Sequence, residues 1–582
     1  MSKYALRDSV PKKVEESLKS YDALMRQLLH ARGFSDADSA ERFLNPDYEA
    51  HLHDPYLLKD MEKAVTRILK AIEKDEKIGI FSDYDADGIP GAVVLHDFFK
   101  KIGYTKFINY IPMRNEEGFG LNVSAIENLV SQGVKLIITI DCGITDVEEV
   151  AFANKHKVDV IITDHHIPAK LLPKAFAIVN PKQKDCEYPE KMLCGSGVIF
   201  KVIQALILKI NFLKIDNCKL KITAPNLGWE KWLLDMVGLA TLSDMVPLLG
   251  ENRVLSYYGM KVLNKSPRVG LQKLFSLLKI NQAKATEDDI AFMITPRINA
   301  ASRMGIPRDA FLALSTTDEV EAGMLAEHLN RINDERKGVV GAMVKEIKKR
   351  IESRDEDMRH VLVFGNPEWK PSLLGLVANS FSDEHGRPVF FWGREGGGDT
   401  MIIKGSCRAG GDTDVFALME KIKDTFLDFG GHKGAGGFSI SQENIHTLED
   451  RLNEAYVELT KEKKVTADVL LDKKLSLDDV NWNTYRSVEK FAPFGLENPK
   501  PLFLFENIEV NQSKLFGKEK NHLELKFRNS SGKDVTAIAF FCTSEKFPVP
   551  TKEGSRINMV ATLEKSEFRN FPELRLRIVD IY

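Results

Sequence analysis

The sequence is poor in cysteine, lacks long apolar runs and carries almost no net charge. Its six cysteines form no CxxC pair, which argues against a zinc ribbon or a disulfide framework and suits a reducing cytoplasm. No apolar run approaches the ~20 residues of a membrane span, and the N-terminus lacks the apolar core of a signal peptide. A net charge of −3 gives no indication of a polyanionic partner, so nucleic-acid binding would need a local basic groove and bound cations.

A clear internal repeat and a long low-complexity tract are also absent. The domain organisation therefore has to be predicted from the order of the apolar runs along the chain. At 582 residues, with 43% hydrophobic and 28% charged residues, we expect a globular protein of two to four domains. Strand-like and helix-like segments alternate in two stretches, as βαβ units do. The expected segments are a helical stretch over 1–75, an α/β domain over 76–316, a long amphipathic connecting helix over 317–353, a second α/β domain over 354–462 and an all-β, OB-fold-like domain over 463–582.

The most informative stretch is Ile78–Leu95, which has the sequence IGIFSDYDADGIPGAVVL. An apolar run ends in Asp83, Asp85 and Asp87, and their alternation places the carboxylates on one side of an extended backbone. Three adjacent anions repel one another unless a cation neutralises them, and hard divalent cations take oxygen ligands of this kind. The stretch therefore predicts a metal site at the carboxyl end of a strand. Taken alone, it would also serve a phosphatase, a pyrophosphatase or a calcium loop.

Three later stretches end in the same kinds of residue. VKLIITI is followed by Asp141, VDVIIT by Asp164, His165 and His166, and WLLDMVGLATLS by Asp244. Adjacent parallel strands bring such ends to one edge of a sheet, and carboxylates with imidazole but no thiolate suit Mn²⁺ or Mg²⁺. A single Asp after a strand is usually a cap or a turn residue. The prediction of a two-metal site therefore rests on the recurrence of acidic and histidine residues after several apolar stretches. We expect Asp164 to orient a histidine rather than to bind metal directly.

The ordered motifs DYDADG, IDCG, TDHH and SDMVPL resemble the DHH phosphoesterase superfamily. More narrowly, the chain resembles the RecJ family of single-stranded-DNA-specific exonucleases in IPMRNEEGFGLN, NPKQKDCEYPEKMLCGSGV, PRINAASRMG, KGSCRA and GGHKGAGG. These motifs cover nearly the whole chain. The resemblance implies a parallel-sheet DHH domain, a second, DHH-associated α/β domain joined to it by the long helix, and a C-terminal all-β, OB-fold-like domain.

The resemblance also implies a site for two divalent ions, Mn²⁺ or Mg²⁺. The implied metal ligands are Asp83, Asp85, Asp87, Asp141, His165 and Asp244. Asp141 is the implied bridging carboxylate, and Asp87, Asp141 and His166 are the implied catalytic residues. His166 would face the scissile phosphate as a substrate ligand or an acid. Which of the first three aspartates touch metal directly stays open.

A second set of residues is implied in holding the end of a nucleic acid. The implied contacts to the strand and its 5′-phosphate are Arg114, Arg297, Asn299, Arg303, Ser406, Arg408 and His432. Arginine suits this role because its planar fork pairs bidentately with phosphate oxygens, although a single arginine can equally form a surface salt bridge. The chain departs from many relatives at Phe81, Lys370 and Ser372, which leaves the metal residues intact and bears on rate or end preference.

The all-β domain offers aromatic and basic residues that could stack bases and track phosphates, although the phenylalanines fit a barrel core at least as well. These residues are Phe503, Phe505, Phe516, Lys514, Lys518 and Lys520.

The expected activity is two-metal hydrolysis of single-stranded DNA from the 5′ end, releasing 5′-mononucleotides in DNA recombination and repair. We expect a cytoplasmic monomer without membrane contact, with single-stranded DNA as substrate and a single-stranded-DNA-binding protein and a helicase as candidate partners. Two rival functions stay open. One is a DHH phosphodiesterase for very short RNA or cyclic dinucleotides, against which the length and the β domain argue. The other is an inactive relative serving as a repair scaffold, against which the complete acid–histidine set argues.

Overall fold

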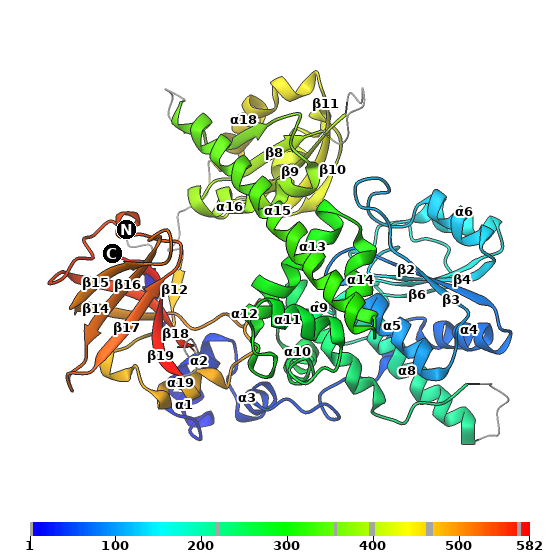
Figure 1. The fold of residues 1–582 in the computed structure, drawn as a ribbon, viewed down its shortest axis with the longest axis horizontal. Coiled ribbons are helices and arrows are strands. Elements are labelled where there is room, and N and C mark those ends of the chain that lie inside the picture. The colour runs from blue at the N-terminus through cyan, green and yellow to red at the C-terminus, as the bar shows by residue number, and fades with distance from the viewer. Residues whose placement is uncertain (1–3, 216–221, 354–357, 395–401, 461–468, 567–571) are drawn as a thin grey trace.

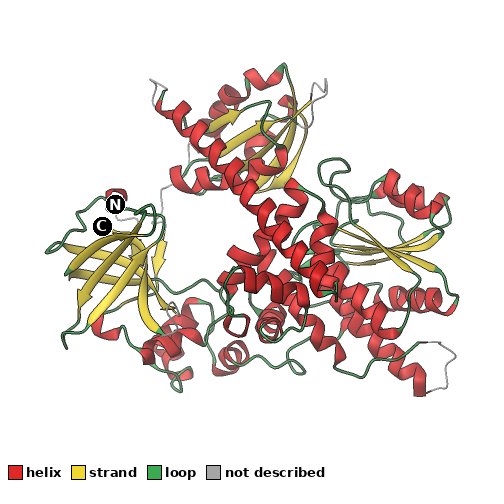
Figure 2. Ribbon diagram, in the orientation of Figure 1, coloured by secondary structure: helices red, strands yellow, loops and turns green. Residues whose placement is uncertain are grey.

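The computed structural model describes residues 4–215, 222–353, 358–394, 402–460, 469–566 and 572–582. The protein has three lobes, two of mixed helix and strand and one dominated by strands, with helices between them (Figure 1). Figure 2 shows a sheet at the centre of each lobe. The two ends of the described chain meet on the strand-rich lobe, where the rings of Tyr4 and Tyr582 stack at 5.5 Å.

The first α/β domain contains a five-stranded sheet in the order β3-β2-β4-β5-β6, in which every neighbouring pair is parallel. Its central strands are short apolar runs buried on both faces, as a parallel sheet covered by helices requires. The predicted parallel-sheet domain is therefore confirmed. Its elements are α4 (Met61–Glu73), β2 (Lys77–Ser82), α5 (Gly88–Ile102), β3 (Phe107–Tyr110), α6 (Val123–Ser131), β4 (Val134–Ile140), α7 (Val147–Lys155), β5 (Asp159–Thr163), β6 (Ala177–Val179) and α8 (Gly195–Ile215).

Helix α8 is long and apolar enough to cross a membrane by length and composition alone. Its window Gly195–Leu213 is 67% buried inside the protein, and side chains such as Phe200 and Leu206 lie in the core of the first domain. No other helix in the described ranges passes this test. The sequence analysis did not single out this run, because Lys201 and Lys209 interrupt its apolar letters.

A layer of helices follows the first sheet and leads into the long connecting helix α15 (Glu319–Glu352), close to the predicted 317–353. The Asp318 side chain caps α15 by accepting hydrogen bonds from the amides of Val320 and Glu321. The preceding elements are α9 (Leu234–Ser243), α10 (Gly250–Leu263), α11 (Val269–Leu277), α12 (Glu287–Asp289), the π-helical turn η4 (Ile290–Ile294), α13 (Thr295–Met304) and α14 (Pro307–Ser315).

The second α/β domain contains a five-stranded sheet in the order β10-β11-β9-β8-β7. Only its β7–β8 pair is parallel, and the other pairs are antiparallel, so its strands are joined by hairpins as well as by helices. Its elements are β7 (Leu362–Gly365), α16 (Pro371–His385), β8 (Val389–Gly393), β9 (Ile402–Arg408), α17 (Val415–Lys421), β10 (Phe426–His432), β11 (Ala435–Ser441) and α18 (Leu448–Thr460).

The C-terminal domain is a seven-stranded sheet in the order β13-β14-β18-β19-β17-β16-β15. Phe503 and Phe505 are fully buried in its core, whereas Phe516 is partly exposed. The core interpretation is therefore correct for the first two rings. The elements are β12 (Val469–Leu471), β13 (Lys473–Lys474), α19 (Trp482–Glu489), β14 (Phe503–Glu509), β15 (Gln512–Phe516), β16 (His522–Arg528), β17 (Asp534–Ala539), β18 (Arg556–Ser566) and β19 (Glu573–Ile581).

The N-terminal segment is divided between two domains, unlike the single unit predicted over 1–75. Its first strand pairs in parallel with β12, and its first helices share a core with the C-terminal sheet, whereas α4 packs against the first α/β domain. Arg253 on α10 fixes the joint by donating to the carbonyl oxygens of Phe43 and Phe491 at 3.0 Å. Amphipathic helices show that an apolar face must be covered, but their sequence does not say by which domain. The elements are β1 (Tyr4–Leu6), α1 (Lys12–Ser17), α2 (Ala23–Ala31) and α3 (Ala37–Leu44).

Candidate metal centre and arginine cluster

The turn from β2 into α5 carries the first carboxylates. Asp83 is buried directly after the strand, and Asp87 stands at the N-cap of α5. A Cβ on Gly88 would lie 2.5 Å from the Asp83 carbonyl oxygen, so any larger residue would displace the turn. Asn299 on α13 holds the turn from outside, because its side-chain oxygen accepts a hydrogen bond from the Ala86 amide at 2.9 Å. Asn299, predicted to contact nucleic acid, thus also positions the aspartates.

Asp141 follows β4, and the start of α8 fixes its carboxylate. Its φ of 63° lies in the left-handed region, which is uncommon for a residue other than glycine. A Cβ on Gly195 would lie 2.5 Å from the Asp141 Cβ, so the helix approaches this closely only because glycine begins it. The amides of Gly195 and Ser196 also donate to the two carboxylate oxygens of Asp87, at 2.6 and 2.7 Å. The N-terminus of α8 therefore positions two carboxylates, where its dipole favours negative charge.

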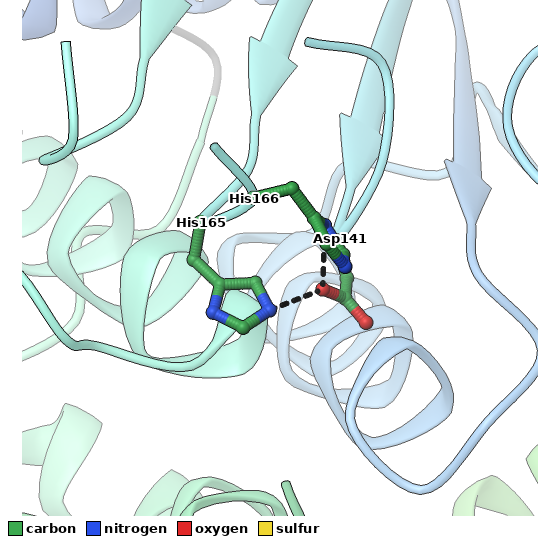
Figure 3. A group of neighbouring side chains, drawn as sticks. All are labelled: Asp141, His165 and His166. Atoms are coloured by element: carbon green, nitrogen blue, oxygen red, sulfur yellow. Dashed lines mark ion pairs between the residues drawn. The ribbon is translucent and has the colours of Figure 1, made fainter. Parts of the chain in front are cut away.

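Two histidines follow β5, and both rings approach the Asp141 carboxylate (Figure 3). His165 Nε2 lies 3.2 Å from Asp141 Oδ1, 3.7 Å from Asp244 Oδ2 and 3.9 Å from Asp87 Oδ2. His166 Nδ1 lies 3.8 Å from the same Asp141 oxygen. The predicted convergence of β2, β4 and β5 at one edge is confirmed. Asp244, however, comes from the C-cap of α9, because its apolar stretch forms a buried helix rather than a strand.

Asp164 orients His166. Its Oδ1 lies 2.7 Å from His166 Nδ1 and accepts hydrogen bonds from the amides of His165 and His166, while Oδ2 accepts one from the Ile144 amide. Although burial opposes ionisation, the hydrogen bonds from His166 hold the pKa of Asp164 below its ordinary value. Burial acts to lower the pKa of His166, but the hydrogen bond to Asp164 and the negative charges of Asp164 and Asp87 together outweigh it and raise that pKa. The predicted orienting role of Asp164 is confirmed by these contacts.

The other carboxylates are buried and crowd one another. Burial, followed by repulsion between neighbouring aspartates, raises the pKa of Asp87 to about 6 and of Asp244 to about 9. The same causes raise the pKa values of Asp83 and Asp141 well above the ordinary range. Asp83 Oδ1 and Asp141 Oδ1 are buried without a hydrogen-bond partner. This donor set of oxygens and imidazole fits Mn²⁺ or Mg²⁺, which would neutralise the crowded charges.

All six predicted metal ligands belong to groups whose ligand atoms lie within 4.8 Å of one another. Asp141 and His165 each belong to two of the groups, and Asp141 is the carboxylate among them. The groups are Asp83, Asp85 and Asp141; Asp87, His165 and Asp244; and Asp141, His165 and His166.

Arg303 on α13 is the centre of a group of guanidinium groups, here called the arginine cluster, that consists of Arg114, Arg303, Arg336 and Arg408. Burial lowers the pKa of Arg303 to about 9, and the charges of the other three arginines add to the shift while Asp85 opposes it. Arg303 Nη1 donates to the Ser372 carbonyl at 2.6 Å, but its Nε is buried without a partner. A buried cation among cations needs an anion, just as the carboxylates need a cation.

The cluster is assembled from both α/β domains and the helix between them. Arg114, in the loop after β3, lies with its Cζ 5.1 Å from the centre of the Tyr84 ring. Arg408, on β9, donates to the Ser406 hydroxyl at 3.1 Å. Arg336, on α15, has a buried Nε without a partner. The sequence analysis missed Arg336, because the periodicity of α15 marks its apolar positions and gives no signal for a functional cation.

Arg297 differs from the cluster, although it was predicted to contact phosphate. Its Nε and Nη2 donate to the Asn330 side-chain oxygen at 3.0 and 2.9 Å, and its Nη1 donates to the Met293 carbonyl at 2.6 Å. These bonds use three of the five N–H donors of the guanidinium and join α13 to α15. The structure therefore gives Arg297 a place in this joint, and its contact with phosphate stays a prediction.

A cavity of about 420 Å³ connects the aspartate turn with the second α/β domain. His432, exposed at the end of β10, lines it together with residues of the metal groups, as predicted. The lining consists of Asp85, Ala86, Asp87, Ser243, Asp244, Met245, Asn299 and His432.

The loop after β6 contributes two polar residues that the sequence analysis did not name. Asn180 donates to the His166 carbonyl at 3.0 Å and accepts a hydrogen bond from the Lys182 amide at 2.8 Å. Lys182 lies within electrostatic range of Asp141 and Asp244, and burial lowers its pKa. The segment NPKQKDC contains both residues, but nothing in the sequence distinguishes them as site residues.

Two departures from the family pattern can be placed. Phe81 is fully buried and its ring stacks on Tyr110 at 5.5 Å, within the core on one face of the first sheet. Ser372 accepts from Arg303 Nη1 with its main-chain carbonyl, which any residue has, and its hydroxyl donates to the Arg303 carbonyl at 3.2 Å. Neither departure removes a side chain from the groups that can hold a metal.

Three domain-family models match the chain: the DHH family N-terminal domain over 77–229, the DHHA1 domain over 358–458 and the RecJ OB domain over 471–580. The single-stranded-DNA-specific exonuclease RecJ of Bacillus subtilis is 33% identical over 558 residues, which cover 96% of this chain and 67% of the relative. The protein of the same name from Haemophilus influenzae is 29% identical over 587 residues, which cover 99% of both chains.

The fold is also similar to crystal structures of RecJ from Thermus thermophilus. The complex with Mn²⁺ has a TM-score of 0.79 and 25% identity, covering 100% of this chain and 79% of the other. The complex with Mg²⁺ has a TM-score of 0.73 and 23% identity, covering 99% and 78%. With its DHH, DHHA1 and OB domains in this order and its relatives matched over most of their length, the chain belongs to the RecJ family of DHH phosphoesterases.

Proposed function

We propose that the protein is a metal-dependent exonuclease that hydrolyses single-stranded DNA from the 5′ end and releases 5′-mononucleotides. One observation carries the proposal: a carboxylate cluster that needs cations and an arginine cluster that needs an anion meet at Asp85. This residue lines the cavity, belongs to a metal group and is the carboxylate that opposes the pKa shift of Arg303. A nucleic-acid end held between metal ions and arginines would complete both clusters. The names of the relatives support this choice of substrate.

Two divalent ions, Mn²⁺ or Mg²⁺, would occupy the carboxylate cluster. When bound, they would activate a water molecule and offset charge on the phosphate. Asp141 would be shared between the two ions. Asp141 and His165 each belong to two of the ligand groups, but only a carboxylate has two oxygen atoms that can bind separate ions at one site. The residues that would hold them are Asp83, Asp85, Asp87, Asp141, His165 and Asp244.

The arginine cluster would bind the terminal 5′-phosphate. Arg303 and Arg408 offer forked donors, and Ser406 adds a hydroxyl beside Arg408. Fixing the end in this way would place the first phosphodiester against the carboxylates, so the enzyme would remove one nucleotide at a time. The entropy of aligning the strand would be lost on binding rather than in the chemical step.

His166 would act on the scissile phosphate through Nε2. Its Nδ1 is occupied by Asp164, and the ring is 44% exposed, so Nε2 is the ring nitrogen left for substrate. Because Asp164 raises the pKa of His166, the ring can hold a proton closer to neutral pH and donate it to a phosphate or leaving oxygen.

The cavity would favour a single strand. Its volume of about 420 Å³ lies in the range of a site for one small ligand, roughly 300–1,000 Å³. It is shared by the two α/β domains that α15 connects, so a base pair would have to separate before one strand could enter. We further propose a cytoplasmic monomer that acts in recombination and repair, beside a helicase that opens duplexes and a single-stranded-DNA-binding protein.

The test uses 5′-labelled and 3′-labelled strands of DNA and RNA, with and without Mn²⁺. We expect immediate release of labelled mononucleotide from the 5′-labelled DNA and gradual shortening of the 3′-labelled DNA, both dependent on the metal. Asp141→Asn should abolish hydrolysis, and Asp185→Asn, at an exposed carboxylate paired with Lys59, should not. Hydrolysis by the Asp141 variant, or faster turnover of a dinucleotide than of a long strand, would overturn the proposal.

A further inference from the structure

A second cavity, of about 460 Å³, lies among the helices of the first α/β domain, and two of the five tryptophans of the chain line it. We call it the indole pocket, and its lining includes Trp229, Trp232, Lys100, Lys101 and Arg268. The ends of α5 and α14 and the starts of α9 and α11 enclose it, and α5 packs against both α9 and α14 (Figure 1). It shares no residue with the metal groups, the arginine cluster or the lining of the first cavity. Its volume lies in the range of a site for one small ligand, roughly 300–1,000 Å³.

The two indoles are placed as a surface for a ligand rather than as core. Trp232 is 57% exposed, although tryptophan is highly buried on average in folded proteins. Trp229 is half-buried, and Lys101 Nζ lies 5.6 Å from the centre of its ring. Leu233 and Leu314 add apolar surface to the lining. An aromatic and apolar wall that stays open to solvent is a surface on which a planar ring can stack.

The buried charges of the indole pocket balance one another, whereas its exposed charges do not. Arg268 donates to Asp97 Oδ2 at 2.6 Å and to Asp235 Oδ2 at 2.8 Å, so the guanidinium and both carboxylates are paired. Lys100 and Lys101 are exposed in the last turn of α5, and neither forms an ion pair with a carboxylate of the described residues. A cation in the last turn of a helix is common. Two such cations beside two indoles are informative, because together they can receive a phosphate and a base.

We propose that the indole pocket binds a nucleoside phosphate, at a site separate from the metal centre. The base would stack on Trp232, and the phosphate would lie against Lys100 and Lys101. The ion pairs of Arg268 would stay intact, so the ligand would enter without the rearrangement of a buried charge. An apolar segment of a protein would cover the rings but would make no use of the two lysines.

Two helices connect the indole pocket to the metal centre. Helix α5 has Asp87 at its N-cap and the two lysines in its last turn, and its 15 residues span about 22 Å. Helix α9 has Asp235 in its first turn and Asp244 at its C-cap. Arg268 ties the pocket ends of both helices together through Asp97 and Asp235. A ligand that shifts these ends would change the placement of two predicted metal ligands and therefore kcat. This effect rests on the proposed function, whereas the binding does not.

The first test titrates the full chain with 5′-dAMP, deoxyadenosine and inorganic phosphate, and follows tryptophan fluorescence and heat. Each protein tested carries Arg303→Gln, which removes a phosphate donor from the arginine cluster. We expect the parent to bind dAMP with quenching, and Trp232→Ala to bind dAMP and deoxyadenosine about tenfold more weakly, the loss of one stacked base. Lys101→Gln should weaken dAMP up to about fivefold and leave deoxyadenosine unchanged, because only dAMP carries a phosphate. Trp482→Ala, at a 38% exposed indole of the C-terminal domain, is the control and should match the parent.

Two results of this titration would overturn the inference. One is an equal affinity of the parent and Trp232→Ala for dAMP. The other is the absence of binding by dAMP and deoxyadenosine alike, the result expected if the pocket takes an apolar segment of a protein. Because Trp232 and Lys101 are exposed, both variants should melt at the temperature of the parent, which separates lost binding from unfolding.

The second test adds dAMP during hydrolysis of 5′-phosphorylated DNA, with Arg303 restored. As a product, dAMP should compete at the arginine cluster and raise KM of the wild type and of Trp232→Ala alike. Through the pocket it should also change kcat at least twofold, in the wild type only. An unchanged kcat of the wild type would overturn the connection along α5 and α9. A protein that binds dAMP through Trp232 but hydrolyses no DNA would overturn the proposed function and support the pocket.

Discussion

The carboxylate cluster and the arginine cluster are alike in being incomplete. Each gathers buried charges of one sign from several elements, and each leaves a buried polar atom without a hydrogen-bond partner, Asp83 Oδ1 in one and Arg303 Nε in the other. Their pKa shifts have opposite directions but the same first cause, which is burial. Both clusters lower the stability of the unliganded protein, and ligands of opposite charge would restore it.

The two clusters differ in how rigidly they are held. Apart from Asp244, at the C-cap of α9, the carboxylates follow strands at one edge of a single sheet, and the start of α8 holds Asp87 there. The arginines come from the loop after β3, α13, α15 and β9, which belong to two domains and the helix between them. Metal binding should therefore depend on local geometry, and substrate binding on how the two domains are placed. The following predictions test this difference.

The largest change in activity should distinguish two arginines of α13. Arg303→Gln should lower kcat/KM for 5′-phosphorylated strands about 100-fold or more, the cost of losing an aligned charged donor, with little change in melting temperature. Arg297→Gln should mainly lower the melting temperature, because the partly buried Asn330 oxygen loses two donors, each bond being worth about 0.5–1.5 kcal/mol. Steady-state kinetics and thermal unfolding of both variants would measure the contrast. The opposite pattern would place Arg297 at the phosphate.

A smaller loss of activity should distinguish two glycines of α8. Gly195→Ala should push Asp141 and Asp87 from their positions, because the new Cβ would lie 2.5 Å from the Asp141 Cβ, and kcat should fall about 100-fold. In Gly197→Ala the new Cβ would meet nothing closer than 3.6 Å, so activity should persist and helix propensity should add about 0.5–1 kcal/mol to stability. Equal activities in the two variants would show that the close approach of α8 does not position the carboxylates.

Asp164→Asn should lower kcat about 10- to 100-fold, as the loss of a partner behind a functional histidine does. Because Asp164 raises the pKa of His166, the variant should also move the alkaline limb of the kcat profile to lower pH. Asp159→Asn, at a carboxylate that pairs with Arg67, is the control and should leave the profile unchanged. An unshifted alkaline limb in Asp164→Asn would rule out His166 as the proton donor.

The smallest effect concerns stability without metal. The pKa of Asp87 is raised to about 6 and that of Asp244 to about 9, so the folded protein binds protons that the unfolded chain has released. The contribution of these two groups to stability should therefore be greatest below about pH 4, their ordinary range, and fall as pH rises towards 9. Melting temperature in a chelator should show this decline, and Mn²⁺ should flatten it. A melting temperature in chelator that rises from pH 6 to 9 would contradict the assignment of these pKa shifts.

Much of the fold could be predicted, because buried parallel strands are short apolar runs and their ends are marked by Asp141 and by Asp164. The division of the N-terminal segment could not, since the apolar faces of α2 and α3 fit any apolar surface and only the structure shows them on the C-terminal sheet. The stretch before Asp244 has the composition of a buried strand and of a buried helix alike, so its sequence did not decide between them.

The convergence of the carboxylates was easier to predict than that of the arginines. Carboxylates that follow strands recur at one edge, so their positions in the chain fix their positions in space. Arg297 and Arg303 are the same type of residue and lie on the same helix. Only their contacts distinguish them: Arg297 is bonded to Asn330, whereas Arg303 Nε has no hydrogen-bond partner. Arg336 carries no local signal, because its role depends on the packing of α15 against α13.

The most direct test of the central claim, that the carboxylates form a site completed by two divalent ions, is a calorimetric titration of the metal-free protein with Mn²⁺. The wild type and Asp185→Asn should each bind two ions, and Asp141→Asn, which removes the shared carboxylate, should bind fewer. Absence of binding by the wild type, or two ions bound by Asp141→Asn with unchanged affinity, would contradict the account.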